Sequence, residues 1–179
     1  MVYIFLADGF EEAEALVPAD LLRRAGLETA LVAVKGDTAT GSHQIRVKAD
    51  CTLAQVDLSK AELLVLPGGL GGVRGLQAEP NIAAMVQVAL DNDIWVAAIC
   101  AAPTLLGKWG HLKGKRAVCY PGMEGQLTGG QAVPDSGVVV DGRIITGRAA
   151  GSAFDFGLAL VEALAGPDKA REVRDEVCY

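Results

Sequence analysis

The stretch Glu62-Leu-Leu-Val-Leu66 runs directly into Pro67-Gly68-Gly69, and it decides the fold. A short apolar run that ends at turn-forming residues is typical of a strand buried on both faces of a sheet. A helical period follows over Asn81–Leu90, and a second apolar run, Ile94–Ile99, comes after it. Strands that alternate with helices in this way predict a parallel sheet joined by crossover helices.

The same alternation extends toward the N-terminus. Val2–Leu6 is expected to form a buried strand, and Glu12–Ala25 has the apolar spacing of a helix that ends at Gly26. Pro18 lies inside this helix, where it cannot donate a backbone hydrogen bond. Leu31–Val34 is expected to form the next strand, so the first strand also belongs to a strand–helix–strand unit.

The pattern continues toward the C-terminus with one hairpin. Val138–Thr146 is expected to form it, with Asp141-Gly142 as the two-residue turn. Gln44–Lys48 alternates like an edge strand. The remaining expected elements are a short strand, Arg116–Cys119, and the helical segments Ala102–Trp109, Ser152–Ala165 and Pro167–Val177.

Composition limits the class of protein. The chain has 179 residues, of which 51% are apolar and 21% charged, so residues 1–179 are expected to form one domain; a collagenous, coiled-coil or disordered chain is excluded. Sixteen basic and 22 acidic residues give a net charge of −6. The sequence has no cluster of basic residues that could neutralise a phosphate backbone, so a nucleic-acid partner is not expected. No apolar window reaches the roughly 20 residues of a membrane span. The four cysteines lack a C-x-x-C pair and the N-terminus lacks a basic leader, which favours a reducing cytoplasm.

A candidate nucleophile lies where a predicted strand passes into a helix, in Ala98-Ile-Cys100-Ala-Ala102. Small residues on both sides of a cysteine permit the sharp turn of a nucleophile elbow. The amides and dipole of a following helix favour thiolate over thiol. Cysteine is also common at strand ends as a small buried apolar residue, and this pentapeptide alone leaves both interpretations open.

Glycines follow the deciding strand in the run Leu66-Pro-Gly-Gly-Leu-Gly-Gly72. Their backbone amides could complete an oxyanion hole with the amide of Ala101, but a plain glycine loop remains open as the alternative. The run is not a dinucleotide-binding fingerprint, because Arg74 occupies the third glycine position.

Carboxylates gather at the start of the first helix, in Asp8-Gly-Phe-Glu-Glu-Ala-Glu14. Acidic residues at a helix start complement the helix dipole, so only a spatial neighbour would give one of them a chemical role. Neither His43 nor His111 lies in a metal-ligand pattern, and no metal is predicted. His43 is kept as a candidate neighbour of the site.

Taken together, these motifs resemble the ThiJ/PfpI superfamily, and within it the branch of the Parkinson-disease-associated protein deglycase. The resemblance covers essentially the whole chain. It is carried by Gly9–Glu14, Pro18, Arg23–Gly26, Leu66–Gly69, Ala97–Thr104, Thr146–Arg148 and Gly151–Phe156. It implies an α/β, flavodoxin-like three-layer sandwich with a mostly parallel central sheet, and a homodimer.

The resemblance also implies roles for single residues. Cys100 would be the reactive cysteine, Glu14 the acid that faces it, and Gly68, Gly69 and Ala101 the surrounding backbone amides. Arg24 would lie near the pocket or the dimer interface, and Arg148 is a further candidate pocket residue. Where many relatives carry a histidine, this chain has Tyr120, which is another candidate pocket residue. The missing histidine counts against protease-like and glutaminase-like activity.

A magnitude explains why an acid would matter beside the cysteine. A helix end is worth up to ~2 kcal/mol, which takes a thiol pKa from about 8.5 to about 7. A protonated carboxyl that donates to the sulfur adds about 1.5–3 kcal/mol, whereas an ionised one repels the thiolate. The prediction is therefore a Cys100 thiolate beside a neutral Glu14 whose pKa is raised.

Such a pair supports two functions. One is cofactor-independent conversion of small reactive dicarbonyls such as methylglyoxal, as a glutathione-independent glyoxalase or deglycase, with Glu14 as proton donor and acceptor. The alternative is a redox-responsive stress protein or chaperone that senses peroxide through oxidation of Cys100, with little turnover. A binding module with an incidental cysteine stays open as a third interpretation.

Overall fold

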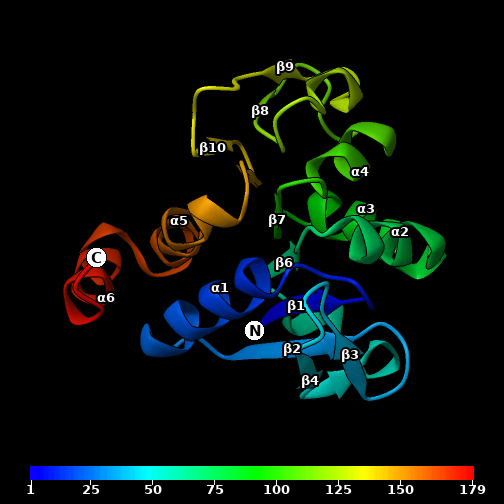
Figure 1. The fold of residues 1–179 in the computed structure, drawn as a ribbon. Coiled ribbons are helices and arrows are strands. Elements are labelled where there is room, and N and C mark those ends of the chain that lie inside the picture. Colours follow the sequence, from blue (N-terminus) through cyan, green and yellow to red (C-terminus); the bar gives the residue numbers. More distant parts are fainter.

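A seven-stranded sheet forms the middle layer of the molecule in the computed structural model, which describes residues 1–179 (Figure 1). Its strands are β1 (Val2–Leu6), β2 (Thr29–Ala33), β5 (Cys51–Thr52), β6 (Leu63–Leu66), β7 (Trp95–Ile99), β10 (Val138–Asp141) and β11 (Ile144–Gly147). Their order is β10-β11-β7-β6-β1-β2-β5, and every pair is parallel except β10 with β11. The predicted mostly parallel sheet is confirmed.

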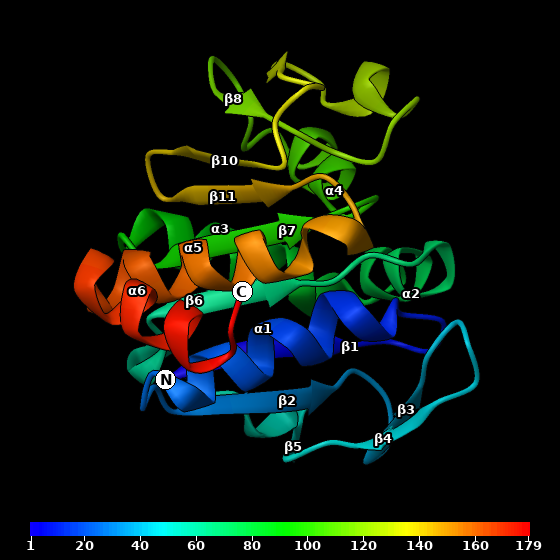
Figure 2. The ribbon, with the colours of Figure 1, turned by 60° about the vertical axis from the view of Figure 1, so that its left-hand side comes forward.

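Helices cover both faces of this sheet, as apolar strands without a polar face require. They are α1 (Glu12–Arg24), α2 (Leu70–Ala78), α3 (Pro80–Asp91), α4 (Pro103–Lys108), α5 (Ala153–Ala165) and α6 (Pro167–Glu176). Figure 2 shows α1, α5 and α6 together on one face. Side chains of α2, α3 and α4 pack in the core on the opposite face. The three-layer α/β sandwich expected from the resemblance is therefore present.

Alternating residues of the central strands divide between the two cores. In β1, Tyr3 and Phe5 face the core under α2–α4, whereas Val2, Ile4 and Leu6 face the core under α1 and α5. All five are buried, which explains why the run is apolar throughout. This double burial fixes the register of the strands, and with it the positions of the loops at their carboxyl ends.

The helix α1 is held tightly against α5. Gly157 of α5 lies so close to α1 that a Cβ there would come within 2.7 Å of the Leu21 side chain and 3.1 Å of the Cα of Pro18. Pro18 is inside α1, as predicted. This close packing sets the position of the first turn of α1 relative to the sheet, and the acidic residues lie on that turn.

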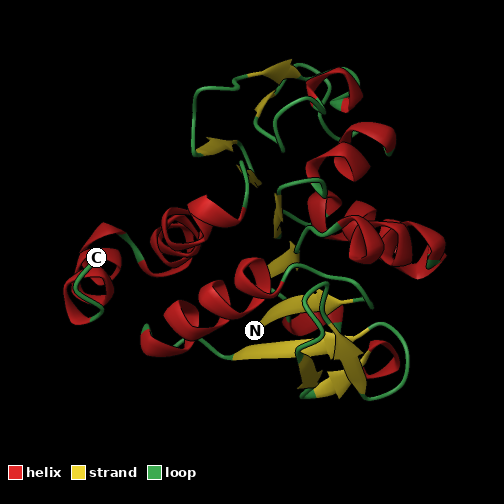
Figure 3. Ribbon diagram, in the orientation of Figure 1, coloured by secondary structure: helices red, strands yellow, loops and turns green.

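Four local predictions are corrected by the structure (Figure 3). Within Gln44–Lys48, only β4 (Arg46–Lys48) is a strand; it pairs with β3 (Thr38–Thr40) in a separate ribbon, and β5 is the edge of the main sheet. The hairpin of β10 and β11 is confirmed, but its turn residues are Gly142 and Arg143. Gly142 has a φ of 61°, which suits the first position of a type II′ turn.

The third correction concerns the glycine run. It is not a plain loop, because α2 begins at Leu70 and includes the last two glycines of the run, Gly71 and Gly72. A Cβ at Gly72 would lie 2.7 Å from the Cα of Phe10, so small residues let this helix approach the loop after β1.

The fourth correction concerns the strand predicted over Arg116–Cys119. It is confined to β8 (Arg116–Ala117), which pairs with β9 (Gln131–Ala132) apart from the main sheet. None of the helices is long and apolar enough to cross a membrane.

Candidate active site

Cys100 lies at a strained elbow directly after β7. Its φ is 65°, a left-handed conformation that is costly for a residue with a side chain. Two backbone hydrogen bonds hold it there: its amide donates to the carbonyl of Gly147 at 2.9 Å, and its carbonyl accepts from the amide of Tyr120 at 2.7 Å. The predicted sharp turn at a strand-to-helix junction is confirmed.

Glu14 projects from the first turn of α1 and is completely buried. Its Oε2 accepts the amide of Gly68 at 2.9 Å, whereas Oε1 is buried without a well-aligned hydrogen-bond donor. The carboxyl group interacts with the thiol of Cys100. A Cβ at position 68 would lie 2.4 Å from Oε2 and 2.6 Å from the Cβ of Cys100, so only glycine leaves room for this pair.

Burial dominates the electrostatics of the pair. It raises the pKa of Glu14 to about 7; the charge of Glu11 adds to this effect, and hydrogen bonds from Cys100 and Gly68 oppose it. Burial also raises the pKa of Cys100 to about 12, with a further contribution from an ionised Glu14. Because the groups interact, these pKa values belong to the pair, which holds one shared proton across the range between them.

The backbone amides near Cys100 divide between two tasks. Those of Gly69 and Ala101 donate to the sulfur and act to lower the pKa of Cys100. The amide of Gly68, which the resemblance placed in the same group, instead donates to Glu14. Gly69 has a φ of 82° and precedes α2, so the glycine run turns its amide toward the cysteine.

A cavity of about 420 Å³ opens in front of Cys100. Apart from the thiol and the two amide-bearing residues, its wall is mainly apolar, and Glu11 is its one charged residue. The lining residues are Glu11, Gly69, Leu70, Cys100, Ala101, Tyr120, Pro121, Gly122 and Met123. Tyr120 was predicted, whereas Leu70 and Met123 had no sequence signal beyond their proximity to the glycine run and to Tyr120.

Glu12, another acid of the first turn, binds His43 and has no contact with the cavity of Cys100. Glu12 is buried and accepts the amide of His43 at 2.8 Å and its ring Nδ1 at 3.0 Å. Although burial opposes it, these bonds and those from backbone amides lower the pKa of Glu12 to about 2. His43 thus binds the acidic turn and does not line the cavity of Cys100. Ligand atoms of Glu11, Glu12 and His43 lie within 4.8 Å of one another, but Glu12 and His43 are hydrogen-bonded to each other and Glu11 accepts from the Ser42 hydroxyl.

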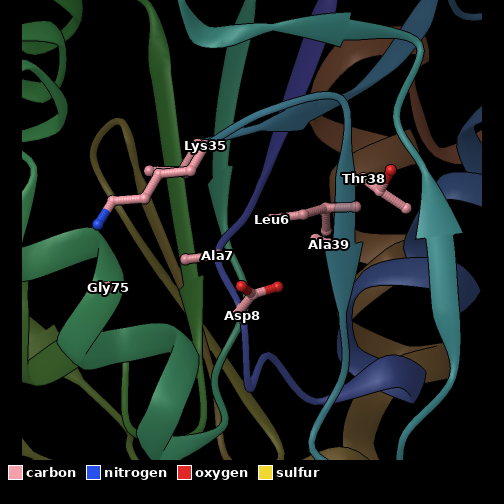
Figure 4. Close-up of a pocket in the computed structure, with 8 residues that line it drawn as sticks. Leu6, Ala7, Asp8, Lys35, Thr38, Ala39 and Gly75 are labelled. Carbon is pink, nitrogen blue, oxygen red and sulfur yellow. The ribbon is translucent and has the colours of Figure 1, made fainter.

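Asp8 belongs to a second, smaller cavity of about 110 Å³ at the carboxyl ends of β1 and β2 (Figure 4). Its Oδ1 accepts the amide of Thr40 at 2.8 Å, and the Thr38 hydroxyl donates to Asp37. Lys35, also in this wall, extends toward Gly75 and away from Asp8 in Figure 4. The polar groups here hold the ribbon of β3 and β4 to the end of β1.

Two predicted pocket residues lie elsewhere. Arg24 is at the far end of α1, about 15 Å along the helix from Glu14, where it pairs with Asp20 and Glu176. Arg148 follows β11, and its amide donates to the carbonyl of Gly137. Neither lines the cavity of Cys100 within one chain. Their roles in the pocket or at a dimer interface stay predictions.

Comparisons with known proteins agree with this geometry. The model of the DJ-1/PfpI family matches residues 1–163. The chain is 40% identical over 172 residues to the protein dj-1beta of Drosophila melanogaster, covering 95% of this chain and 92% of that protein. It is 30% identical over 169 residues to a Caenorhabditis elegans protein named glutathione-independent glyoxalase DJR-1.2, covering 94% and 90%.

Solved structures give the same result. The crystal structure of Drosophila melanogaster DJ-1beta superposes with a TM-score of 0.93 at 37% identity, covering 99% of this chain and 96% of that one. A structure described as oxidized Toxoplasma gondii DJ-1 superposes with a TM-score of 0.92 at 29% identity, covering 99% and 97%. The similarity extends over the whole domain and includes both ends of the sheet.

Proposed function

The chain belongs to the DJ-1/PfpI family, and on that premise we propose that it converts reactive dicarbonyls without a cofactor, with Cys100 as nucleophile and Glu14 as proton donor and acceptor. The observation that carries the proposal is the pairing of a strained cysteine with a buried carboxyl group one of whose oxygens lacks a donor. A glyoxalase-named relative supports the class of reaction.

The shared proton belongs on Glu14 in this proposal. Two backbone amides, of Gly69 and Ala101, donate to the sulfur, whereas one, of Gly68, donates to the carboxyl group. With the proton on Glu14, the repulsion between two negative charges disappears and the carboxyl becomes a third donor to the sulfur. In this proposal the negative charge lies on Cys100 and the proton on Glu14, the reverse of the order that burial alone gives.

The reaction follows from this charge distribution, with methylglyoxal as the substrate. The sulfur of Cys100 bonds to the aldehyde carbon, whose oxygen is held by the amides of Gly69 and Ala101 and takes up a proton. Glu14, having supplied that proton, takes the hydrogen of the same carbon as a proton and passes it to the oxygen of the neighbouring ketone, which gives an enediol. The proton of the first hydroxyl group then moves through Glu14 to the carbon of the former ketone, which leaves a thioester of lactate. Water cleaves the thioester and regenerates the thiol, so that methylglyoxal and one water give lactate.

Lactate formation from methylglyoxal, in metal-free and glutathione-free buffer, tests the proposal. We expect Cys100→Ser to lower kcat/KM at least 100-fold, and Cys178→Ser, which changes an exposed cysteine that does not line the cavity, to have little effect. Turnover that survives in Cys100→Ser would contradict the proposal.

A redox-sensing role is the second candidate, favoured by the similarity to a structure described as oxidized. A Cys100 thiolate that attacks hydrogen peroxide gives a sulfenate and water, and reaction with a second peroxide gives a sulfinate and another water. A protonated Glu14 would donate to that sulfinate. Mass spectrometry after graded peroxide treatment separates the functions. Oxidation confined to Cys100 without dicarbonyl turnover favours the sensor, and turnover favours the enzyme.

The homodimer and the cytoplasmic location stay predictions from the resemblance and the cysteine pattern. Sedimentation of the purified chain over a range of concentrations tests the first. A dimer with Arg24 in its interface would dissociate more readily as Arg24→Ala, and a monomeric wild type would refute it.

A further inference from the structure

The wall of the main cavity carries information about the substrate beyond its aldehyde group. None of the nine lining residues is cationic, and Glu11 is the one that carries a charge. The Glu11 side chain is engaged from outside by the Ser42 hydroxyl at 3.1 Å and by His43 Nδ1 at 3.5 Å. Within one chain, the cavity therefore offers no side chain that would compensate the charge of a carboxylate or phosphate.

Exposed apolar side chains surround the same cavity. Leu70, directly after Gly69, is 62% exposed, and Tyr120 is 49% exposed. A contiguous exposed apolar patch beside a cavity marks a ligand-binding surface. Met123 and Pro121 continue the wall beside Tyr120, so an apolar surface stands over the nucleophile.

Tyr120 is fixed beside the reacting atoms by its backbone. Its amide donates to the carbonyl of Cys100 at 2.7 Å, and the amide of Met123 in turn donates to the carbonyl of Tyr120 at 3.0 Å. The backbone of Tyr120, which carries the ring, is therefore held by a hydrogen bond directly to Cys100 at the elbow. A flat apolar group bound to the sulfur of Cys100 would lie against this ring, because ring and sulfur line the same space.

We propose that the site selects neutral 2-oxoaldehydes with an aromatic or bulky apolar substituent over small or anionic carbonyls, and that Tyr120 is the residue that determines this specificity. The inference rests on the proposed function, because it concerns the substrate of the same cysteine. A cavity of about 420 Å³ lies within the range for small-molecule sites and leaves most of its volume empty around methylglyoxal.

Steady-state kinetics with three carbonyls test the selectivity. We expect kcat/KM for phenylglyoxal to exceed that for methylglyoxal at least tenfold, and the anionic 2-oxoaldehyde 4,5-dioxopentanoate to be at least 100-fold poorer than phenylglyoxal. Tyr120→Ala should lower kcat/KM for phenylglyoxal at least tenfold more than for methylglyoxal, whereas Tyr120→Phe should keep the preference. Tyr179→Ala is the matched control, since Tyr179 is equally exposed but stacks on Phe154 and does not line the cavity.

Alkylation of Cys100 tests the same wall without turnover. The probes are iodoacetamide, iodoacetate and phenacyl bromide, each measured on the Cys100 peptide against N-acetylcysteine under identical conditions. We expect the ratio of the alkylation rate with iodoacetamide to that with iodoacetate to be at least tenfold larger for Cys100 than for N-acetylcysteine. We expect the ratio of the rate with phenacyl bromide to that with iodoacetamide also to be larger for Cys100 than for N-acetylcysteine. The preference for phenacyl bromide should disappear in Tyr120→Ala and persist in Tyr120→Phe.

The two experiments keep the two proposals apart. Selective alkylation without turnover of any 2-oxoaldehyde would refute the enzymatic function and leave the selectivity in place. Turnover with the same substrate ratios in wild type and Tyr120→Ala would refute the role of Tyr120. If 4,5-dioxopentanoate were turned over as well as phenylglyoxal, the exclusion of anions would be refuted.

Discussion

Glu12 and Glu14 lie two residues apart on the first turn of α1, both are buried, and their pKa values move in opposite directions. The pKa of Glu12 falls to about 2, and that of Glu14 rises to about 7. Burial acts in the same sense on both, since it always favours the neutral acid. The difference therefore comes from the donors that the rest of the chain brings to each carboxyl group.

The segment 41–45 supplies Glu12 with donors. Backbone amides of His43 and Ile45, the His43 ring and the Ser42 hydroxyl all approach its two oxygens. Gly41 makes this possible, since a Cβ there would lie 2.1 Å from Oε1 of Glu12. A buried carboxylate with this many donors is a structural anchor that stays ionised.

The loop after β6 gives the carboxyl group of Glu14 few hydrogen-bond donors, in contrast to the segment around Glu12. Gly68 again leaves the space that the carboxyl group fills, but it supplies one amide, and Oε1 receives no aligned donor. A carboxyl group kept short of donors holds its proton more strongly, and that proton is then available to a neighbouring sulfur. The comparison shows that the number of hydrogen-bond donors around a buried carboxyl group decides whether it stays ionised, as Glu12 does, or has a raised pKa, as Glu14 does.

The largest expected effect is on turnover. Glu14→Gln removes the exchangeable proton while keeping the shape, so we expect kcat/KM for methylglyoxal to fall at least 100-fold, or about 2.7 kcal/mol. Glu12→Gln is the matched control, the same change at the other buried acid, and should cost less than about fivefold. Lactate assays on both variants measure it, and equal losses would break the distinction between anchor and acid.

Stability should respond in the reverse order. Glu12→Gln exchanges an acceptor for a donor opposite the His43 ring, so we expect a loss of about 1–2 kcal/mol in the free energy of unfolding near pH 7. Glu14→Gln should be neutral or slightly stabilising there, because wild type must either protonate Glu14 on folding or bury its charge, and glutamine requires neither. Urea unfolding of the two variants beside wild type decides, and a larger loss in Glu14→Gln would contradict the assignment.

Sequence patterns predicted much of this arrangement and missed one part of it. The apolar runs of β1, β6 and β7 and the period of α1 placed the acidic turn and Cys100 at the same edge of the sheet. The division of labour among the acids was not predictable from the pattern. It depends on donors from residues 31 to 54 positions away, such as His43 for Glu12 and Gly68 for Glu14.

The helix α2 was missed for a related reason. Gly71 and Gly72 are poor helix formers in isolation, yet they lie in the first turn of α2 because their lack of side chains lets the helix pack on Gly9 and Phe10. Tertiary contact overrides local preference here. Leu70, the first residue of α2, lines the cavity of Cys100. Because the position of α2 depends on this tertiary contact, no local sequence pattern indicated that Leu70 lines the cavity.

The pH dependence of stability gives a finer test, because the two acids contribute with opposite sign. The pKa of Glu12 is lower in the folded protein than its ordinary 4.5, so its contribution is present above about pH 4.5 and is lost as the pH falls toward 2. The pKa of Glu14 is raised, so its cost is absent below pH 4.5 and grows as the pH rises to about 7. We expect Glu12→Gln to lose stability relative to wild type above pH 4.5, and Glu14→Gln to gain it between pH 5 and 8. Unfolding curves at several pH values measure both slopes, and slopes of equal sign would contradict this account.

The smallest effect is expected at His43, the exposed partner of Glu12. Its ring is 68% exposed, so in His43→Ala water takes over the bond at Nδ1, while the backbone amides of residues 43 and 45 still donate. The pKa of Glu12 should therefore rise by less than about 1 unit. A carbon-detected NMR titration of the carboxyl groups reads this directly, with Ser42→Ala as the companion variant at a second exposed donor. A rise of Glu12 to its ordinary value in His43→Ala would mean that one exposed ring, and not the set of backbone donors, separates the anchor from the acid.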